Sequence, residues 1–339
     1  MILTNLTLQN FRSYAKKTFE FSPETTLIVG PNASGKTNIL EAIMFLATGK
    51  SFRADADREA IVWGSELARV RARISNESEL EIVITQGEVL GQKAPMKKYL
   101  VNGVPRRQID FVGNLRAVLF WPEHLELVTD SPSLRRRYLD SVLVQVDREY
   151  RRSLMSYERG LRQRNRLLDL INEGKAGRGQ LLFWNQLLIR TGGYLTDTRA
   201  AFIDFVNKNN NFTLEYDKSV ISESRLAQYA KEEVAAKATL VGPHRDDFTF
   251  FVGGKDMSKF GSRGQQRLTV LWLKLAELSY IEKEIGERPV LLLDDIFSEL
   301  DDMHRELVVD LTAKQQTILT SAGRDIMSII SKDATRIEL

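Results

Sequence analysis

One octet constrains this chain more than any other feature. Residues 30–37, Gly-Pro-Asn-Ala-Ser-Gly-Lys-Thr, match the phosphate-binding pattern G-x-x-x-x-G-K-[ST]. Residues 26–29 before the octet predict a buried strand, and residues 39–48 after it predict a helix. In this context the glycines let successive backbone N–H groups surround phosphate oxygens at a helix N-terminus. We therefore expect a nucleotide-binding loop formed by Gly30, Pro31, Asn32, Ala33, Ser34, Gly35, Lys36 and Thr37.

A second motif supplies the carboxylate that such a loop requires for its metal ion. Residues 290–293 are apolar, predict a buried strand, and are followed by Asp294 and Asp295. We expect Lys36 to neutralise the β- and γ-phosphates of ATP, and Thr37 and Asp294 to hold Mg²⁺, Asp294 through water. Asp295 would face the attacking water as a general base or polarising group. The alternative, a strand that ends in an aspartate capping a helix, is less favoured because a P-loop is already present.

The spacing of the two motifs determines the domain organisation. Lys36 and Asp294 lie 258 positions apart, yet both must meet at one Mg²⁺, so the ATPase fold is split by an insertion. A chain of 339 residues has room for about two domains. We expect an α/β ATPase head of residues 1–130 and 240–339. Residues 131–239, where apolar residues recur at helical spacing on both sides of a glycine-rich tip, would form an inserted helical arm.

Composition excludes several classes of protein. The chain is 27% charged and 43% hydrophobic, which is typical of globular proteins and not of disordered or fibrous ones. Because it has no cysteine, it forms no disulfide and no thiolate metal site, and its three scattered histidines disfavour a metal cage. Residues 1–10 alternate in polarity, unlike a signal peptide, and no apolar run approaches the roughly 18 residues of a membrane span. We expect no membrane segment.

Two further groups of residues have simpler explanations than chemistry. His244 and Arg245 precede two aspartates and suggest an acid–base pair or a metal site. A turn that packs the arm against the head explains them without catalysis, and we prefer it. The four tryptophans lie in apolar stretches, so we expect them in the core: Trp63, Trp121, Trp184 and Trp272.

The arm contains a strongly basic segment. Residues 133–170 include ten arginines and five acidic residues, a local net charge of +5, whereas the whole chain carries +3. Arginines on a long helix can donate to phosphate oxygens and bind nucleic acid independently of its sequence. They can equally form a solvated face with ion pairs to nearby acids. Composition alone leaves both interpretations open.

The motifs described so far, with three further stretches, resemble the RecF family, a branch of the ABC-type ATPases related to the SMC and Rad50 proteins. The further stretches are residues 10–14 (NFRSY), 131–140 (SPSLRRRYLD) and 242–247 (GPHRDD). Together they extend from one end of the chain to the other. The resemblance implies an α/β, ABC-type P-loop ATPase head with mixed sheets, plus the inserted helical arm.

The same resemblance implies contacts with a second copy of the chain. Residues 260–267 (FGSRGQQR) are similar to the ABC signature loop, in which Ser262, Gly264 and Gln265 would meet the γ-phosphate held by the opposite subunit. Without the resemblance, Ser262 is equally well explained as a helix N-cap and Gly264 as a loop glycine. Ser298 and Asp301 match the D-loop that crosses the dimer seam. Two ATP molecules would lie between two heads, so that ATP drives dimerisation and hydrolysis reverses it. Asp295 replaces the usual glutamate, and Thr320-Ser321 replaces a transporter's switch histidine, which suggests slow turnover as a switch.

The resemblance also implies a cellular role. The protein would be a cytoplasmic, nucleoid-associated, ATP-dependent DNA-binding protein of recombinational repair and replication restart. Its homodimer would clamp duplex DNA near single-strand gaps and, with RecR and RecO, help to load RecA. DNA is then favoured as the partner of the basic segment, which would recognise the shape of the DNA and not its base sequence. The candidate contacts are Arg135, Arg136, Arg137, Arg151, Arg152, Arg162 and Arg166.

Three other classes compete with this interpretation. An SMC- or Rad50-like head would carry a much longer coiled coil and, in the Rad50 type, a Cys-x-x-Cys hook that this chain lacks. A transporter-type ATPase would carry the switch histidine and serve a membrane partner. A structural adaptor with an inactive P-loop would tolerate replacement of Lys36.

Overall fold

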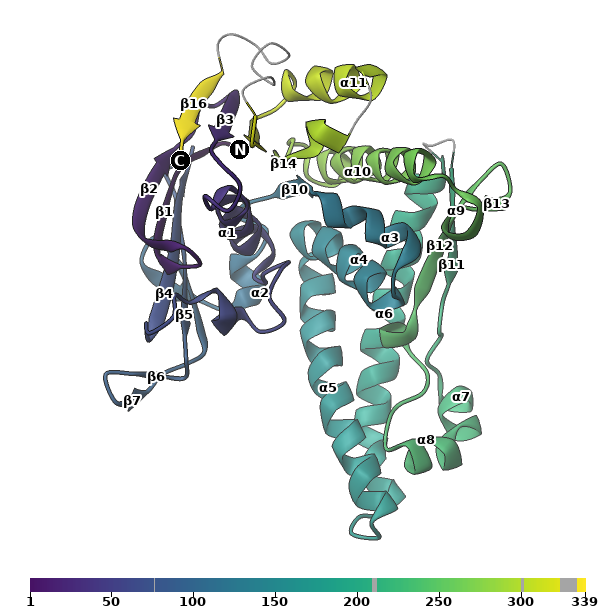
Figure 1. Ribbon diagram of the computed structural model, residues 1–339. Coiled ribbons are helices and arrows are strands. Elements are labelled where there is room, and N and C mark those ends of the chain that lie inside the picture. Colours follow the sequence, from purple (N-terminus) through teal and green to yellow (C-terminus); the bar gives the residue numbers. More distant parts are fainter. Residues whose placement is uncertain (76, 209–211, 300–301, 324–333) are drawn as a thin grey trace. The chain divides into compact units, whose positions relative to one another are not determined.

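The computed structural model describes residues 1–75, 77–208, 212–299, 302–323 and 334–339 (Figure 1). Two compact units are present: unit 1 comprises Met1–His124 and Glu277–Leu339, and unit 2 comprises Leu125–Ala276. Unit 2 therefore extends beyond the expected arm of residues 131–239. The reason is that β12 (Asp247–Val252) pairs with β11 (Thr213–Asp217) in one antiparallel sheet, which ties the segment after residue 239 to the helical arm.

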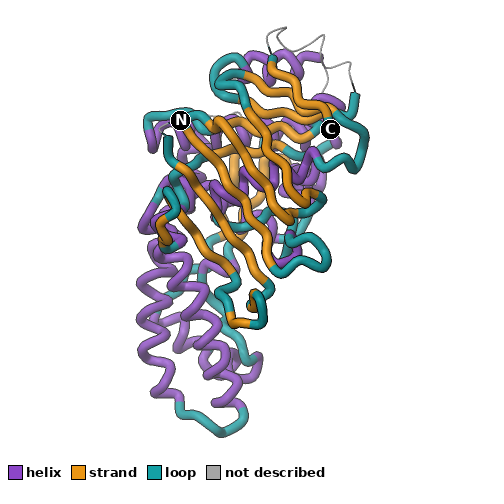
Figure 2. Tube along the Cα trace, turned by 90° about the vertical axis from the view of Figure 1, so that its left-hand side faces the viewer, coloured by secondary structure: helices purple, strands orange, loops and turns teal. Residues whose placement is uncertain are grey.

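Unit 1 contains a large antiparallel sheet (Figure 2). It has six strands in the order β2-β1-β4-β5-β8-β9. Along β4, apolar residues from Ala68 to Ile74 alternate with arginines, and the apolar ones are buried. Because side chains alternate across a strand, one face of this sheet covers a core and the other carries charge. The strands are β1 (Leu3–Phe11), β2 (Tyr14–Glu20), β4 (Leu67–Ile74), β5 (Glu79–Thr85), β8 (Lys97–Val101) and β9 (Val104–Arg106).

A second, parallel sheet of unit 1 has the order β10-β14-β15-β3-β16. Its three central strands are buried along their whole length, which explains their continuous apolar sequences. Helix α1 (Lys36–Thr48) is buried on almost every side, since it contacts strands of both sheets. The strands are β3 (Thr25–Val29), β10 (Ala117–Phe120), β14 (Val290–Asp294), β15 (Thr317–Ser321) and β16 (Thr335–Glu338).

Shorter elements complete unit 1. These are η1 (Asp57–Ala60), β6 (Glu88–Val89), β7 (Gln92–Lys93), α2 (Gln108–Phe111), η2 (Pro122–Leu125), η5 (Ile296–Glu299) and α11 (Asp302–Thr312). The expectation that the tryptophans belong to the core is wrong for Trp63 and for Trp272 of α10, which are exposed, and Trp121 and Trp184 are only half-buried. Trp63 lies in a turn before β4, and its side chain is 100% exposed, because the neighbouring Val62 N–H is bonded to the Asn10 carbonyl and Gly64 reverses the chain.

Unit 2 is built around a helical hairpin, as the sequence predicts. Helices α5 (Arg148–Asn172) and α6 (Leu182–Lys208) pack along their length, and Gly160 lets α5 approach Leu187 and Leu188 of α6 closely. Asp147 caps α5 by accepting hydrogen bonds from two backbone N–H groups. The other elements are α3 (Glu126–Thr129), α4 (Pro132–Val146), η3 (Arg178–Leu181), α7 (Glu223–Gln228), α8 (Ala230–Ala236), η4 (Pro243–Arg245), β13 (Lys255–Asp256), α9 (Met257–Phe260) and α10 (Arg263–Ile285), the last of which continues into unit 1.

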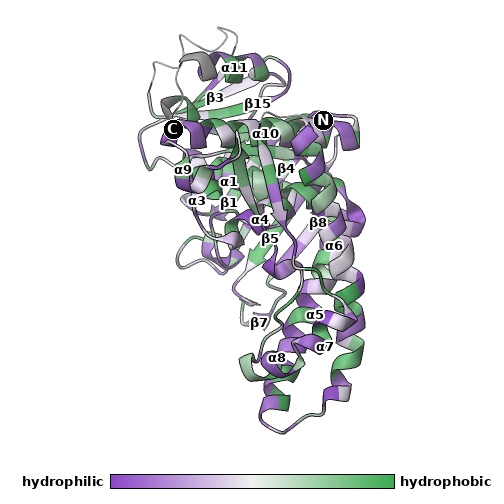
Figure 3. Ribbon diagram, turned by 90° about the vertical axis from the view of Figure 1, so that its right-hand side faces the viewer, coloured by the Kyte–Doolittle hydropathy of each residue, from purple (hydrophilic) through white to green (hydrophobic). Residues whose placement is uncertain are grey.

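The hydropathy of the arm follows this packing (Figure 3): apolar and polar residues alternate along α5 and α6 with helical periodicity. Among the described residues, no helix is both long and apolar enough to cross a membrane.

Candidate functional site

The phosphate-binding loop connects β3 to α1. Its backbone is left-handed at Ala33 (φ 65°) and Gly35 (φ 102°), which curls the loop before the first turn of the helix. A Cβ atom at Gly35 would lie 2.7 Å from the hydroxyl oxygen of Tyr14, so glycine is required there. Burial raises the pKa of Tyr14 to about 12, so this neighbouring hydroxyl stays neutral. The loop thus leads into a helix N-terminus, where phosphate oxygens are favoured.

The two motifs that the arm separates in sequence meet in the structure. The Thr37 hydroxyl donates a hydrogen bond to Asp294 Oδ2 (2.8 Å), and the Thr320 hydroxyl donates to Asp294 Oδ1 (2.6 Å). This happens because β15 lies between β14 and β3, so three adjacent parallel strands end at the same edge. Ligands of open α/β sheets bind at such carboxyl ends.

The chemistry of this edge fits a magnesium nucleotide. Lys36 Nζ donates to the carbonyl oxygens of Gly30 (2.7 Å) and Pro31 (2.9 Å), so its charge lies within the loop. The Ser34 hydroxyl is buried, and no described residue accepts its hydrogen bond, which suits an anion with many acceptor oxygens. A hydroxyl and a carboxylate oxygen beside each other, as at Thr37 and Asp294, are hard ligands of the kind Mg²⁺ prefers.

Asp295 lies at the same edge, one residue beyond the end of β14. Its backbone is left-handed (φ 49°), and its N–H donates to the Thr320 hydroxyl (3.1 Å). Thr320 therefore joins both aspartates, donating to one and accepting from the other. The sequence identifies Thr320 only as a departure from the transporter pattern and does not predict its bond to Asp294. The register of β14 and β15, which pairs Asp294 with Thr320, produces it.

Arg12 is held by a carboxylate of the P-loop helix. Its guanidinium donates to both oxygens of Glu41 (2.9 and 2.6 Å), and Glu41, fully buried on α1, also accepts from the Ser51 hydroxyl (2.5 Å). Arg12 is therefore a half-buried, paired arginine and not a solvated side chain at the end of a strand. The pair links the end of β1 to the helix that follows the P-loop.

The signature-like loop of unit 2 forms the N-terminus of α10. Ser262 and Gln265 form a reciprocal capping box, in which the Ser262 N–H donates to Gln265 Oε1 (2.9 Å) and the Gln265 N–H donates to Ser262 Oγ (3.3 Å). Ser262, Gly264 and Gln265 are all exposed. In the D-loop, Ser298 belongs to η5, and Asp301 lies outside the described residues.

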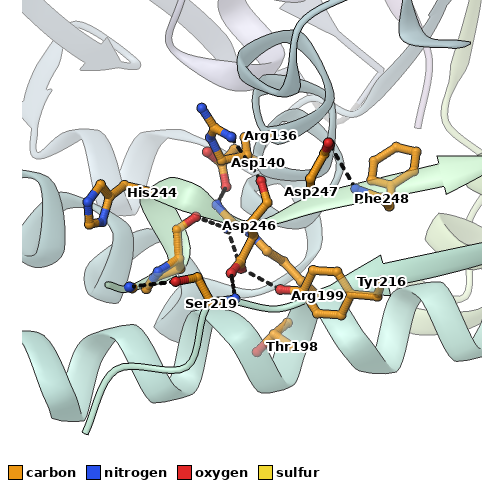
Figure 4. A network of polar contacts seen from close by, with 12 residues as sticks. Arg136, Asp140, Thr198, Arg199, Tyr216, Ser219, His244, Asp246, Asp247 and Phe248 are labelled. Atoms are coloured by element: carbon orange, nitrogen blue, oxygen red, sulfur yellow. Dashed lines mark hydrogen bonds and ion pairs between the residues drawn. The ribbon is translucent and has the colours of Figure 1, made fainter. Parts of the chain in front are cut away.

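The GPHRDD stretch organises a buried polar network in unit 2 (Figure 4). Arg199 of α6 donates to Asp140 Oδ1 (2.8 Å), Asp246 Oδ2 (3.0 Å) and the Pro243 carbonyl oxygen (2.7 Å). Asp246 also accepts from the Tyr216 hydroxyl (2.5 Å), and burial raises the pKa of Tyr216. The network ties α4, α6, β11 and η4 together, so a structural role is sufficient for this stretch.

His244 in the same stretch is a half-buried, neutral histidine. Its Nε2 lies 3.0 Å from the Thr239 carbonyl oxygen, and its Nδ1 lies 2.7 Å from the Tyr157 hydroxyl. Because a carbonyl only accepts, Nε2 carries the proton and Nδ1 accepts from Tyr157. Burial lowers the pKa of His244. Within the described part of the chain, no group of three or more metal-ligating side chains is present.

Three of the seven arginines expected to contact DNA have structural contacts instead. Arg135 is buried, donates through two nitrogens to Asp247 (2.6 and 2.9 Å), and also binds two backbone carbonyls of α3 and the segment after it. Four of its five N–H groups are thus used, and its assignment to DNA is wrong. Arg136 donates to the Asp246 carbonyl (2.8 Å), and Arg151 donates to the Val144 carbonyl at the end of α4 (2.6 Å).

The other four, Arg137, Arg152, Arg162 and Arg166, are exposed. Helix α5 has two more exposed arginines, Arg148 and Arg159, which belong to the basic segment but not to the seven candidate DNA contacts. The five arginines of α5 recur every three or four residues, except where Met155 interrupts them, and so fall within an arc of about 80°. Its buried residues, such as Tyr157 and Arg164, lie on the opposite side. Helical periodicity applied to the arginines alone could have identified this row.

Four of these exposed arginines, Arg152, Arg159, Arg162 and Arg166, have at most a weak ion pair within the described part of the chain. Arg152 approaches Glu149 Oε2 at 3.6 Å, with both side chains in solvent. Arg159, Arg162 and Arg166 form no ion pair with any residue that the structure describes. We call Arg148, Arg152, Arg159, Arg162 and Arg166 the arginine row. From the first to the last it spans about 27 Å of helix.

Comparison with known proteins gives a consistent result. Residues 2–336 match the model of the RecF/RecN/SMC N-terminal domain. The DNA replication and repair protein RecF of Lachnoclostridium phytofermentans is 38% identical, over 95% of this chain and 93% of the relative. A solved structure of the recombination mediator RecF with ATP, in the RecFOR pathway, is 30% identical, with a TM-score of 0.83 over 95% of this chain and 94% of that one. A further RecF structure of that pathway superposes with a TM-score of 0.87, at 30% identity, over 99% and 95% of the two chains.

Proposed function

This chain belongs to the RecF family, and from that premise we propose that it is an ATP-dependent DNA-binding protein of recombinational repair. The relatives with this fold are DNA replication and repair proteins, and two of the solved structures are recombination mediators of the RecFOR pathway. We therefore assign to this chain the same pathway, with RecR and RecO as partners and RecA loading as the outcome.

The observation that carries the nucleotide part of this proposal is the 2.8 Å hydrogen bond between Thr37 and Asp294. Lys36 would exchange the carbonyls of Gly30 and Pro31 for the β- and γ-phosphates, and the loop N–H groups would surround the phosphate oxygens. Thr37 and Asp294 would hold Mg²⁺, with Thr320 fixing the orientation of the carboxylate. Bound Mg²⁺ would supply the charge that balances the triphosphate.

Asp295 is the residue that would receive a proton from water, at its side-chain carboxylate. The Asp295 side chain is one methylene shorter than that of a glutamate, and its backbone has the left-handed φ of 49°. We therefore expect slow ATP hydrolysis that acts as a timer. This matches a switch better than a metabolic enzyme.

A second copy of the chain would complete the nucleotide site. The exposed Ser262, Gly264 and Gln265 are free of other protein cover, and the capping box fixes the geometry of the loop before any partner arrives. Each triphosphate would add affinity for the closed dimer over the monomers, and hydrolysis would remove it.

DNA binding would use the arginine row and the exposed Arg137. A row of guanidinium groups on a rigid helix can contact successive phosphates of a backbone without reading bases. Such binding is independent of sequence and falls steeply with salt.

The test compares wild type with Lys36→Ala and, as a matched control, Lys231→Ala on the exposed face of α8. Molecular mass is measured in solution with and without Mg-ATP, followed by duplex DNA binding at two salt concentrations. Wild type and the control should dimerise with ATP and bind DNA, whereas Lys36→Ala should stay monomeric. A wild type that remains monomeric with ATP and ignores DNA would overturn the proposal.

A further inference from the structure

A large apolar side chain stands in solvent beside the signature-like loop. Phe260 is the last residue of α9 and is 70% exposed. The four residues 262–265, which begin two positions later, are exposed as well. A single exposed aromatic residue is common on protein surfaces, so exposure alone does not indicate an interface. The backbone around Phe260 provides the second observation.

Hydrogen bonds on both sides of Phe260 hold its backbone in place. Asp256 caps α9 by accepting from the Ser258 N–H (2.8 Å), and the Gly261 N–H donates to the Met257 carbonyl oxygen (3.2 Å). The same carbonyl accepts from Gln266 Nε2 (3.0 Å), which ties α9 to the first turn of α10. A Cβ at Gly261 would lie 2.6 Å from that oxygen, so the chain turns tightly directly after Phe260. The backbone that carries the ring is therefore already ordered, and burying the ring in an interface costs little further entropy.

We propose that Phe260 is an apolar anchor of the ATP-dependent dimer and packs against the second copy beside the nucleotide site that Ser262 completes. This inference rests on the proposed function. The occupant is a second copy because Phe260 lies two residues before Ser262, so a surface that closes over the exposed Ser262 also closes over the ring. A buried, preordered aromatic side chain is typical of the residues that dominate interface affinity. In a two-fold dimer the contact occurs twice, so one substitution removes two anchors.

The experiment measures the dimer dissociation constant in saturating Mg-ATP by sedimentation for wild type, Phe260→Ala and Phe183→Ala. Phe183 is a matched control: it is 65% exposed, belongs to the same unit, and lies on α6 in the arm. Phe260→Ala should weaken the dimer at least about tenfold, and Phe260→Leu should recover part of the loss. Phe183→Ala should match wild type.

The outcomes separate this inference from the function on which it rests. If wild type dimerises with ATP and Phe260→Ala dimerises equally well, the anchor is refuted and the dimer stands. The same conclusion holds if Phe183→Ala weakens the dimer as much as Phe260→Ala. If wild type stays monomeric, the proposed dimer itself fails. Equal urea midpoints for the variants would show that weaker association does not reflect unfolding, and Phe260→Glu, which adds a charge at the same point, should then abolish the dimer.

Discussion

Thr320 Oγ1 donates a 2.6 Å hydrogen bond to Asp294 Oδ1 and so fixes the carboxylate whose other oxygen accepts from Thr37. The same hydroxyl accepts from the N–H of Asp295. One threonine on the middle strand of the parallel sheet thus orients the proposed metal ligand and the proposed base together. Its position makes it a sensitive probe of the site, although it would touch neither phosphate nor metal.

We predict that Thr320→Val weakens Mg-ATP binding tenfold or more, because a hydrogen bond to a charged group contributes about 1.5–3 kcal/mol, and about 1.4 kcal/mol corresponds to a tenfold change in affinity. Thr320→Ser, which keeps the hydroxyl, should bind nearly as well as wild type. Calorimetric titration with ATP in the presence and absence of Mg²⁺ checks the prediction. An equal loss under both conditions would show that Thr320 supports the loop as a whole and not the metal ligand.

A second prediction concerns the arginine row. Arg159→Gln, Arg162→Gln and Arg166→Gln combined should reduce the slope of log K against log salt for duplex DNA by roughly 2.7, since each phosphate contact contributes about 0.9. Arg178→Gln with Arg190→Gln, two exposed arginines of unit 2 outside the row, provides the control. Fluorescence anisotropy over a range of salt concentrations gives the slopes. A row that is only a solvated face would leave the slope unchanged.

Much of the ATPase fold could be predicted from the sequence because its signals are local or strongly spaced. The P-loop octet and the apolar run before Asp294 predicted β3, α1 and β14 within one to three residues, and the long distance between them predicted the split. The contact between Thr37 and Asp294 follows from the need for one metal ion.

The sequence predicted the surroundings of the site less well, because long-range pairing decides them. The bond from Thr320 depends on the register between β14 and β15, and composition cannot give that register. Composition treats the arginines of the basic segment alike, yet Arg135 is buried against Asp247, which lies more than a hundred positions away in the sequence. Trp63 was expected in the core because its neighbours are apolar, whereas the turn that carries it turns the ring into solvent.

A third prediction concerns the stability of the arm. Arg164 and Glu233 form a buried ion pair (2.6 Å), in which Arg164 also binds Asn185 and Thr239. Glu233→Ala should lower the free energy of unfolding by about 3–5 kcal/mol, because it leaves a buried charge without its partner. The double variant Arg164→Met, Glu233→Leu should lose much less, since neither charge remains. Urea unfolding measures both, and equal losses in the single and double variants would contradict the prediction.

The exposed pair of Arg152 and Glu149 is the matched control for that experiment. The two side chains are 3.6 Å apart in solvent, and such pairs contribute about 0–1 kcal/mol. Glu149→Ala should therefore change the urea midpoint very little.

The last prediction follows from the lowered pKa of His244. An unfolded histidine has a pKa of about 6.5. Partial burial of the His244 ring keeps the folded pKa below that value, although the hydrogen bond to the Thr239 carbonyl raises it. The nearby charges have opposite effects on this pKa: Arg245 and Arg136 lower it further, and Asp246 raises it. Below about pH 6.5, His244 binds a proton in the unfolded chain but stays neutral in the folded chain until the pH falls to its lower folded pKa. His244 therefore contributes its full stability above that pH, and the contribution is lost as the pH falls.

His244→Gln removes this titration and retains an amide N–H that can donate to the Thr239 carbonyl. Wild type should be the more stable protein at pH 7.5, and its advantage should shrink by up to about 1.4 kcal/mol for each pH unit below 6.5. Carboxylates titrate in both proteins and cancel in the difference. Urea midpoints at pH 7.5, 6.5 and 5.5 test this, and parallel pH profiles for the two proteins would mean that His244 titrates alike in the folded and unfolded chain.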